Sequence, residues 1–443
     1  MRAQFLKYWE RVRSSFWFVP SLMAAGAAVL AFSTVGLDRS VTDKWLTEQS
    51  WAYAGGAEGA SAVLAAIAGS MITIAGVVFS LTLVALSLAS SQFGPRLLRN
   101  FMRDTANQVV LGVFVSTFLY CLLVLRTIRR AEESLFVPHL SVTLGVLFAL
   151  CSIGFLIYFI HHVSVSIQAD EIIAHVGDEL SHGIERLFPQ EIGQPASKST
   201  AAASESTMPE AFDREARPVT ANEDGYLQII DSEALLSLAK KEDAIFRLSR
   251  RPGHYVVRGA SLLMVWPGER VTDELISRIR STFVLGNQRT PEQDVEFPVH
   301  QLVEIAVRAL SPGINDPFTA MTCIDRLSSA LSQLAKRKMP EASRTDEEGR
   351  LRVVAPAISF AGVTDAAFNQ IRQYSRSSAA VTIRLLEAIE TIAGATTRSA
   401  DRATLHRHAE MIERGAREGL SESEDVTAVQ ERFQSVLRAL SEA

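Results

Sequence analysis

The stretch SMITIAGVVFSLTLVALSLASSQFGPR, residues 70–96, carries no charge before Arg96, and serines and threonines recur along its whole length. The uncharged run begins earlier, so that residues 60–89 form one apolar block. As an α-helix this block would be roughly 45 Å long at about 1.5 Å per residue, whereas the hydrocarbon core of a bilayer is about 30 Å thick. The block therefore predicts a transmembrane helix that tilts or projects beyond the lipid.

Three further blocks match the length of a transmembrane helix. Residues 16–36, 107–125 and 140–160 contain no Asp, Glu, Lys or Arg, and each approximates the roughly 20 residues that cross a bilayer. Of the 443 residues, 48% are hydrophobic, and the excess lies in these four blocks. We therefore expect a membrane α-helical fold, with a tail at 1–15 and a transmembrane domain of four spans at 16–163.

The distribution of basic residues favours one orientation in the membrane. Seven Lys and Arg residues flank the spans on the side of the two termini, and five flank them on the other side. This excess places both termini in the cytoplasm. Two of the three cysteines lie within spans and Cys323 lies in a helical segment, so the sequence indicates no disulfide framework.

The remainder of the chain is typical of a cytoplasmic α+β region. A helical extension at 164–188 leads into a linker at 189–222, which is rich in Ser, Ala, Pro and Glu and is expected to be disordered. A small β-rich module is expected at 223–268, because β-branched and aromatic residues are bounded there by Gly and Pro. The helical periodicity of residues 269–443 predicts a helical bundle.

Two resemblances to known proteins rest on short motifs. The turns around Gly253 and Gly259 resemble those of barrel-sandwich hybrid domains, but the lysine that carries biotin or lipoyl is absent from this hairpin, so the resemblance implies a fold and no cofactor. The motifs that carry the second resemblance are FSLTLVALSLASSQFGPRLLRNFMRD (79–104), GYLQIID (225–231), RPGHYVVRG (251–259) and RALSPGINDPFTAMTCIDRL (308–327). With the four spans, they resemble an uncharacterised bacterial family of predicted integral membrane proteins, a domain of unknown function. The resemblance implies a location in the bacterial cytoplasmic membrane and supplies no activity or catalytic residues.

Along a helix, the opening stretch places its small and hydroxyl side chains on one stripe, because they recur at alternating steps of three and four residues. The stripe consists of Ser70, Thr73, Val77, Ser80, Val84, Ser87 and Ser91. Such residues are typical of close-packed interfaces between transmembrane helices. They are also typical of a pore lining, in which the hydroxyls of several subunits replace part of the hydration shell of an ion. Both interpretations are open at this point.

Three arginines, Arg96, Arg99 and Arg103, follow the stripe at helical spacing. In one interpretation they anchor the end of the helix at the lipid headgroups. In the other, they form basic rings at the mouth of a pore and favour anions. The spans contain no acidic residue, which gives no support to a proton or cation relay.

A polar cluster in the helical extension is a candidate metal site. It consists of Glu171, His175, Asp178 and His182. Steps of four, three and four residues place these side chains on one helix face, and their types bind zinc or a similar metal ion. The alternative is a solvated face on which charged groups one turn apart form favourable pairs.

Two pairs of residues in the expected bundle are candidates for a ligand site or an interface. His300 and Glu304 lie one turn apart, and a histidine titrates close enough to neutrality to act as an acid, a base or a pH sensor. Asn315 and Asp316 lie in the turn LSPGINDP. The structural alternatives are an acidic group that suits a helix start and an aspartate that caps the next helix.

The sequence holds no phosphate-binding loop, no nucleophile elbow and no H-E-x-x-H motif, so we expect no enzyme activity and no cofactor other than the metal ion considered above. A net charge of −5 without basic runs interleaved with aromatics argues against nucleic acid as a partner. We expect a homo-oligomeric, channel-like protein of the lipid bilayer whose second span lines a pore. The alternative is a membrane-anchored sensor or scaffold whose cytoplasmic region binds a ligand or partner, without transport.

Overall fold

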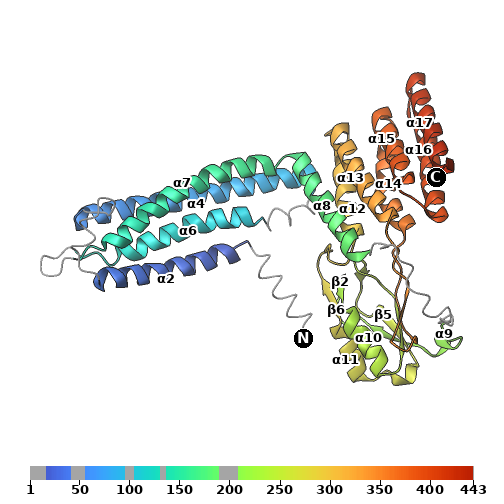
Figure 1. Cartoon of the computed structure of the whole chain (residues 1–443), viewed down its shortest axis with the longest axis horizontal. Coiled ribbons are helices and arrows are strands. Elements are labelled where there is room, and N and C mark those ends of the chain that lie inside the picture. Colours follow the sequence, from blue (N-terminus) through green and yellow to red (C-terminus); the bar gives the residue numbers. More distant parts are fainter. Residues whose placement is uncertain (1–15, 41–54, 95–103, 130–135, 189–207, 443) are drawn as a thin grey trace. The chain divides into compact units, whose positions relative to one another are not determined.

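The structure of the protein is a computed structural model that describes residues 16–40, 55–94, 104–129, 136–188 and 208–442. The chain divides into two compact units, with the division between Glu171 and Ile172. The N-terminal unit holds four long apolar helices, and the C-terminal unit holds the β-strands and a group of amphipathic helices (Figure 1).

The four helices of the N-terminal unit are long and apolar enough to cross a membrane, which confirms the prediction of four spans. They are α2 (Phe18–Ser40), α4 (Ala57–Phe93), α6 (Thr105–Leu125) and α7 (His139–Ser166). α6 packs against each of the other three (Figure 1). Its aromatic side chains Phe114 and Tyr120 are fully buried, as is Phe159 of α7. The interior of this unit is therefore filled by large side chains along α6.

α4 is longer at both ends than the block expected at 60–89. Its 37 residues correspond to about 55 Å. Most of its buried positions hold small side chains, among them Ala60, Ala68, Ala75, Ala85 and Ala89. Alanines let the backbones of α4 and α6 approach closely, which is how helices associate in lipid without a hydrophobic driving force.

A buried carboxylate joins α2 to the start of α7. Asp38 of α2 accepts hydrogen bonds from the backbone N–H groups of Leu140 (2.9 Å) and Ser141 (3.0 Å) and from the Ser141 hydroxyl (2.6 Å). The Tyr120 hydroxyl donates to the Ser141 carbonyl at 3.1 Å and lies 3.1 Å from the Thr34 hydroxyl. Asp38 thus caps α7 from a neighbouring helix, where its charge suits the positive end of the helix dipole.

The helical extension expected at 164–188 is helical, but it is interrupted shortly after the fourth span. α7 ends at Ser166, and a separate helix, α8 (Ala169–Leu187), follows. The first turn of α8 contains Asp170 and Glu171, whose charges favour the N-terminus of a helix. These two carboxylates indicate that a new helix starts here. The helical periodicity of the sequence, which continues across the break, does not reveal this start.

Two sheets form the β-rich part of the C-terminal unit. The larger has the order β1-β5-β3-β8-β7, with β1 (Arg217–Thr220), β3 (Ile245–Leu248), β5 (Ser261–Trp266), β7 (Ser343–Thr345) and β8 (Leu351–Val354). The smaller has the order β4-β2-β6, with β2 (Gly225–Ile230), β4 (Tyr255–Val256) and β6 (Phe283–Gly286). The strands pair antiparallel except β3 and β8, which are parallel. α10 (Ser232–Lys241) and α11 (Asp273–Ser281) contribute Leu235 and Ile279 to the core that Phe246 and Val265 share.

The boundaries of this part differ from those expected. The segment 189–222 is not a linker throughout, because α9 (Phe212–Glu215) and β1 lie within it, and Val219 of β1 is fully buried. The β-rich module also extends beyond 223–268, since β6, β7 and β8 come from the segment expected to be purely helical. Pairing between β3 and β8 joins residues about a hundred positions apart, which a local pattern of residues does not indicate.

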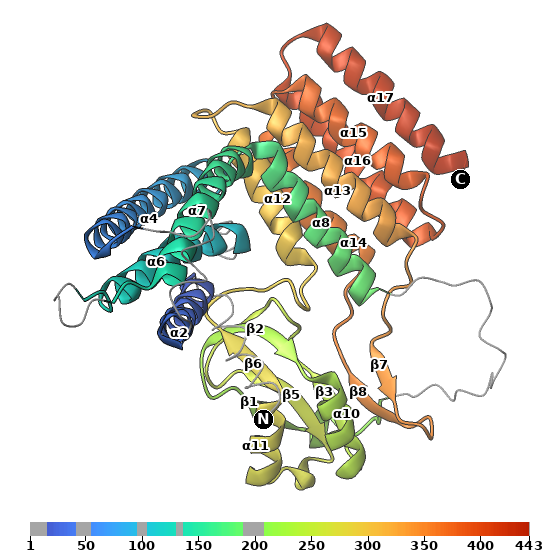
Figure 2. The same cartoon turned by 60° about the vertical axis from the view of Figure 1, so that its left-hand side comes forward.

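Six further helices form a bundle in the C-terminal unit (Figure 2). They are α12 (Glu296–Ala309), α13 (Pro317–Ala335), α14 (Phe360–Tyr374), α15 (Ala379–Ala393), α16 (Ser399–Gly419) and α17 (Ser423–Glu442). α8 joins this bundle, because Gly177 lies so close to the side chain of Arg326 in α13 that a Cβ atom there would be 3.0 Å from the Arg326 Cδ. The hairpin of β7 and β8 is inserted between α13 and α14.

Replacing the capping carboxylate should destabilise the N-terminal unit. Asp38→Ala leaves the first N–H groups of α7 without their acceptor, so we expect the free energy of unfolding to fall by about 2 kcal/mol. Thermal unfolding of the purified protein in detergent measures the change. Ser33→Ala is the matched control, because Ser33 lies on the exposed face of α2 and bonds only to the Val29 carbonyl of its own helix. Equal stability of the two variants would contradict the capping role.

Candidate functional site

The hydroxyl stripe of α4 faces away from the other three helices. All seven positions, Ser70, Thr73, Val77, Ser80, Val84, Ser87 and Ser91, are exposed in the single chain. The alanines described above occupy the opposite side, where α4 is buried. The packing of α4 within its own unit therefore uses the alanine face, and the stripe is presented to whatever surrounds the unit.

Four of the five hydroxyls of the stripe, those of Ser70, Thr73, Ser80 and Ser91, donate to the backbone of their own helix. Ser70 donates to the Ala66 carbonyl at 2.8 Å, and Ser80 donates to the Gly76 carbonyl at 2.9 Å. Thr73 makes the corresponding bond at 2.8 Å. Each of these donors is satisfied without a second helix, while the hydroxyl oxygen keeps acceptor capacity toward the outside.

Two glycines beside the stripe leave room for a close neighbour. Nothing lies within 4 Å of the position that a Cβ atom would take at Gly69 or Gly76. They are seven residues apart and so lie on one side of the helix. No contact within the described part of the N-terminal unit requires a glycine at these positions. Small residues on an outward helix face are typical of sites where another helix approaches.

A polar cluster lies at the opposite end of the N-terminal unit from Asp38. Asp104 caps α6 by accepting from the Ala106 N–H, and its other oxygen is 2.6 Å from Nε2 of His162 in α7. Tyr158 stacks on the His162 ring, with ring centroids 5.5 Å apart. Asn107, one turn along α6, is 1% exposed, and its side-chain amide has no hydrogen-bond partner among the described residues. The two ends of the unit are thus each tied by one carboxylate.

Arg96, Arg99 and Arg103, the expected anchors or mouth residues, lie outside the described residues.

The candidate metal ligands lie on the outer face of α8. Glu171, His175, Asp178 and His182 are all exposed. The alternate face, with Ile173, Val176, Leu180 and Ile184, is buried. Within the described ranges, no group of three or more His, Cys, Asp or Glu side chains is placed to hold a metal ion. The arrangement matches the solvated face that was the alternative interpretation.

His300 belongs to a network of charged groups that joins the sheets to α12. Arg289 forms two hydrogen bonds to the buried Asp294 (2.7 and 3.0 Å), and its Nη1 lies 2.8 Å from the His300 Nδ1. Because a guanidinium only donates, His300 accepts through Nδ1. Glu304 lies one turn on, 3.6 Å from Arg308. The carboxylate and imidazole groups of this region are therefore engaged in structural pairs.

The turn RPGH, quoted above for its resemblance, meets the same network. Arg251 pairs with Glu296 at 2.6 Å and donates to His254 at 3.2 Å. Burial, with the positive charge of Arg251, lowers the pKa of His254. Gly253 has a φ of +91°, and a Cβ atom there would be 2.3 Å from an Asp294 carboxylate oxygen. This close approach is the physical reason for glycine in the motif, and the sequence did not indicate that the two motifs touch.

The turn between α12 and α13 is built by its own residues. Asp316 caps α13, accepting from the Thr319 N–H (3.1 Å) and hydroxyl (2.6 Å). These bonds lower the pKa of Asp316. Asn315 takes a φ of +51°, a left-handed conformation that asparagine tolerates. His300 is near the start of α12 and Asn315 follows its end, so the two candidate pairs do not form one site.

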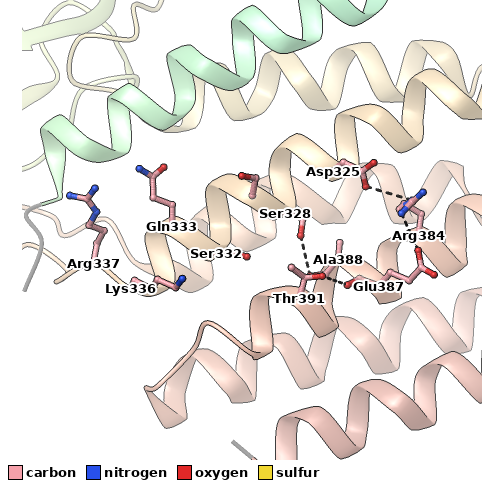
Figure 3. Close-up of a pocket in the computed structure, with 11 residues that line it drawn as sticks. Asp325, Ser328, Ser332, Gln333, Lys336, Arg337, Arg384, Glu387, Ala388 and Thr391 are labelled. Carbon is pink, nitrogen blue, oxygen red and sulfur yellow. Dashed lines mark hydrogen bonds and ion pairs between the residues drawn. The ribbon is translucent and has the colours of Figure 1, made fainter.

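A polar groove between α13 and α15 was not indicated by the sequence analysis (Figure 3). Its volume is about 580 Å³. Arg384 crosses it, 3.5 Å from Asp325 and 3.2 Å from Glu387, and burial raises the pKa of Asp325. The serines of SSALS, at 328, 329 and 332, line the α13 side. Their helical spacing was the available signal, but serines on an amphipathic helix are common on solvated faces.

Comparison with known proteins places the chain in a family. The family model described as a predicted membrane protein (DUF2254) matches residues 13–391. Uncharacterized proteins of Mycobacterium tuberculosis (strain H37Rv) and Mycobacterium bovis are each 34% identical over 372 residues, which is 83% of this chain and 70% of the relative. No solved structure matches the chain. The chain therefore belongs to the DUF2254 family of predicted membrane proteins.

Proposed function

We propose that the protein is a homo-oligomeric, channel-like protein in which α4 of each subunit lines a common conduit. The observation that carries the proposal is the exposure of all seven stripe positions on the face of α4 opposite its alanine face. Among the described residues of its own unit, this hydroxyl face has no packing partner. A ring of subunits would give it one, because cyclic symmetry turns the same face of every copy toward a single axis.

The interior of one unit argues for a conduit between subunits rather than within one. Large side chains, including Phe114, Tyr120 and Phe159, fill the space between the helices. The outward oxygen atoms of Ser70, Thr73 and Ser80 keep acceptor capacity and would replace part of the hydration shell of a permeating ion. Gly69 and Gly76 would allow the α4 helices of neighbouring subunits to approach closely.

The charged residues next to the proposed conduit determine which ions it would favour. The stripe contains no acidic residue, and Arg96, Arg99 and Arg103 follow it in the sequence. Basic residues at the mouth of a pore favour anions, so the transported species in this proposal is a small anion. The proposed activity involves no catalysis, cofactor or nucleic acid.

The alternative is a membrane-anchored sensor or scaffold without transport. The polar groove between α13 and α15 supports it, because a groove of about 580 Å³ that presents both charges and several hydroxyls is large enough for a small polar ligand. In this case the stripe of α4 would serve only as an interface between subunits.

Substitution within the stripe tests the conduit directly. Ser80 lies near the middle of the stripe, and Ser80→Phe should narrow or dewet a conduit and reduce anion flux in reconstituted liposomes at least severalfold. Leu81→Phe is the matched control, since Leu81 is also exposed (47%) but points about 100° away around the helix. It should leave the flux close to that of the wild type.

Flux and oligomer mass measured on one preparation separate the two interpretations of the stripe. Lost flux with an unchanged oligomer indicates a conduit, whereas a dissociated or less stable oligomer indicates a close-packed interface. A folded, oligomeric wild type that passes neither anions nor cations under voltage, tension or pH change would overturn the channel proposal in favour of the sensor or scaffold.

The proposed orientation in the bacterial cytoplasmic membrane places both termini in the cytoplasm. Glu210 is exposed and precedes α9, so a cysteine in the Glu210→Cys variant is accessible to a maleimide reagent. In intact cells a membrane-impermeant maleimide should label this variant no more than the wild type, and labelling should appear after permeabilisation. Labelling in intact cells would show that this segment lies outside the cytoplasm and would contradict the proposed orientation.

A further inference from the structure

Three arginines lie together where α14 ends beside α16. Arg372 is in the last turns of α14, Arg376 follows the end of that helix, and Arg414 is on α16. The two helices pack side by side. Asp365 of α14 contacts Arg407 and His408 of α16 nearer their N-terminal ends, so the helices run in the same direction.

Most acidic groups of the two helices are paired with other bases; Glu418 of α16 is exposed and forms no ion pair among the described residues. Asp365 lies 2.6 Å from Arg407 and 2.8 Å from His408. Glu413 pairs with Arg417, and Asp401 pairs with Arg398. In the part of the chain that the structure describes, the guanidinium groups of Arg372, Arg376 and Arg414 form no ion pair and no hydrogen bond. Three guanidinium groups are therefore left without an ion-pair partner in the described part of the chain.

Close packing fixes the position of Arg376. A Cβ atom at Gly415 would be 3.3 Å from the Arg376 Cδ, and one at Gly419 would be 2.5 Å from the Arg376 carbonyl oxygen. The stem of Arg376 thus lies on the surface of α16 over Gly415, the residue next to Arg414. The two glycines allow this contact, which brings the arginine of the turn to the arginine of the helix.

Arg372 is the innermost of the three. Its Nε is buried and has no hydrogen-bond partner within the described ranges. Burial, together with the positive charges of Arg414 and Arg376, holds the pKa of Arg372 below its ordinary value. A buried donor without an acceptor is costly, as are like charges held together, and a bound anion would relieve both.

We propose that Arg372, Arg376 and Arg414 bind a phosphate group. The planar guanidinium presents paired donors that match phosphate oxygens, and three of them around one anion would neutralise the phosphate charge. The phosphate belongs either to a soluble phosphorylated molecule or to the headgroup of an anionic lipid, since both present the same oxygens. This binding goes beyond the channel proposal and does not depend on it.

Calorimetric titration of the full-length protein in detergent tests the proposal. Inorganic pyrophosphate represents a soluble phosphate, and dihexanoyl phosphatidic acid represents a lipid headgroup, each titrated against potassium chloride at matched ionic strength. We expect at least one of the two to bind the wild type, and Arg414→Gln to weaken that binding about tenfold or more, as the loss of a charged hydrogen-bond donor implies. Arg438→Gln, which removes an exposed arginine of α17, should retain the wild-type affinity.

The stability of the unliganded protein gives a second readout. If the three arginines repel one another, Arg414→Gln should raise the midpoint of thermal unfolding in the absence of ligand. The further rise of this midpoint that the ligand causes in the wild type should be lost in the variant. Binding of pyrophosphate identifies a soluble phosphate as the source, and binding of the lipid analogue alone identifies a headgroup. Absence of binding by both probes, or equal affinity of Arg414→Gln and wild type, would overturn the proposal.

Discussion

Close packing between the alanine face of α4 and the neighbouring α6 is the interaction on which the membrane unit depends. In lipid, the hydrophobic effect does not favour the association of two apolar helices. The association instead depends on van der Waals contact between backbones that approach closely over small side chains. Ala60, Ala68 and Ala75 share buried clusters with side chains of α6 and contribute to this surface. Because the alanine side of α4 packs against α6, the hydroxyl side faces outward. The function of the unit then depends on which surface contacts the hydroxyl side.

Charged groups lie near the two ends of the described transmembrane helices, and two of them, Asp38 and Asp104, close a helix terminus. Asp38 caps α7 from the neighbouring α2, and Asp104 caps α6 while pairing with His162. Helix termini leave N–H groups without intrahelical acceptors, and at the edge of a bilayer few water molecules are available to replace them. In the C-terminal unit, the buried carboxylates Asp294, Asp401 and Glu413 each have an arginine partner.

The sequence predicted the membrane part well, because an uncharged block of about 20 residues has few alternatives to a transmembrane helix. It predicted the stripe but not its outward direction, since periodicity defines a face without telling which neighbour that face meets. The sequence did not indicate that Asp38 is a cap, because the N–H groups that donate to it are about a hundred residues away in the sequence. Likewise, nothing local marks Arg344 and Arg352 as members of a sheet with Phe246, or brings Gly253 against Asp294. The expected metal ligands on α8 had suitable types and spacing, but one helix alone supplies no closed coordination shell.

The parallel pairing of β3 with β8 makes the C-terminal unit indivisible. The chain enters the sheets after α8, leaves them for α12, returns as the hairpin of β7 and β8, and leaves again for α14. A fragment ending before residue 343 would therefore lack β8 and β7, the two strands at one edge of the larger sheet. The backbone edge of β3, beside the buried Phe246, would then be open to pairing with other chains, a recognised route to aggregation. Five residues of chain join β8, the neighbour of the central strand β3, to the start of α14, so a tension applied to α14 would be transmitted directly to the sheet.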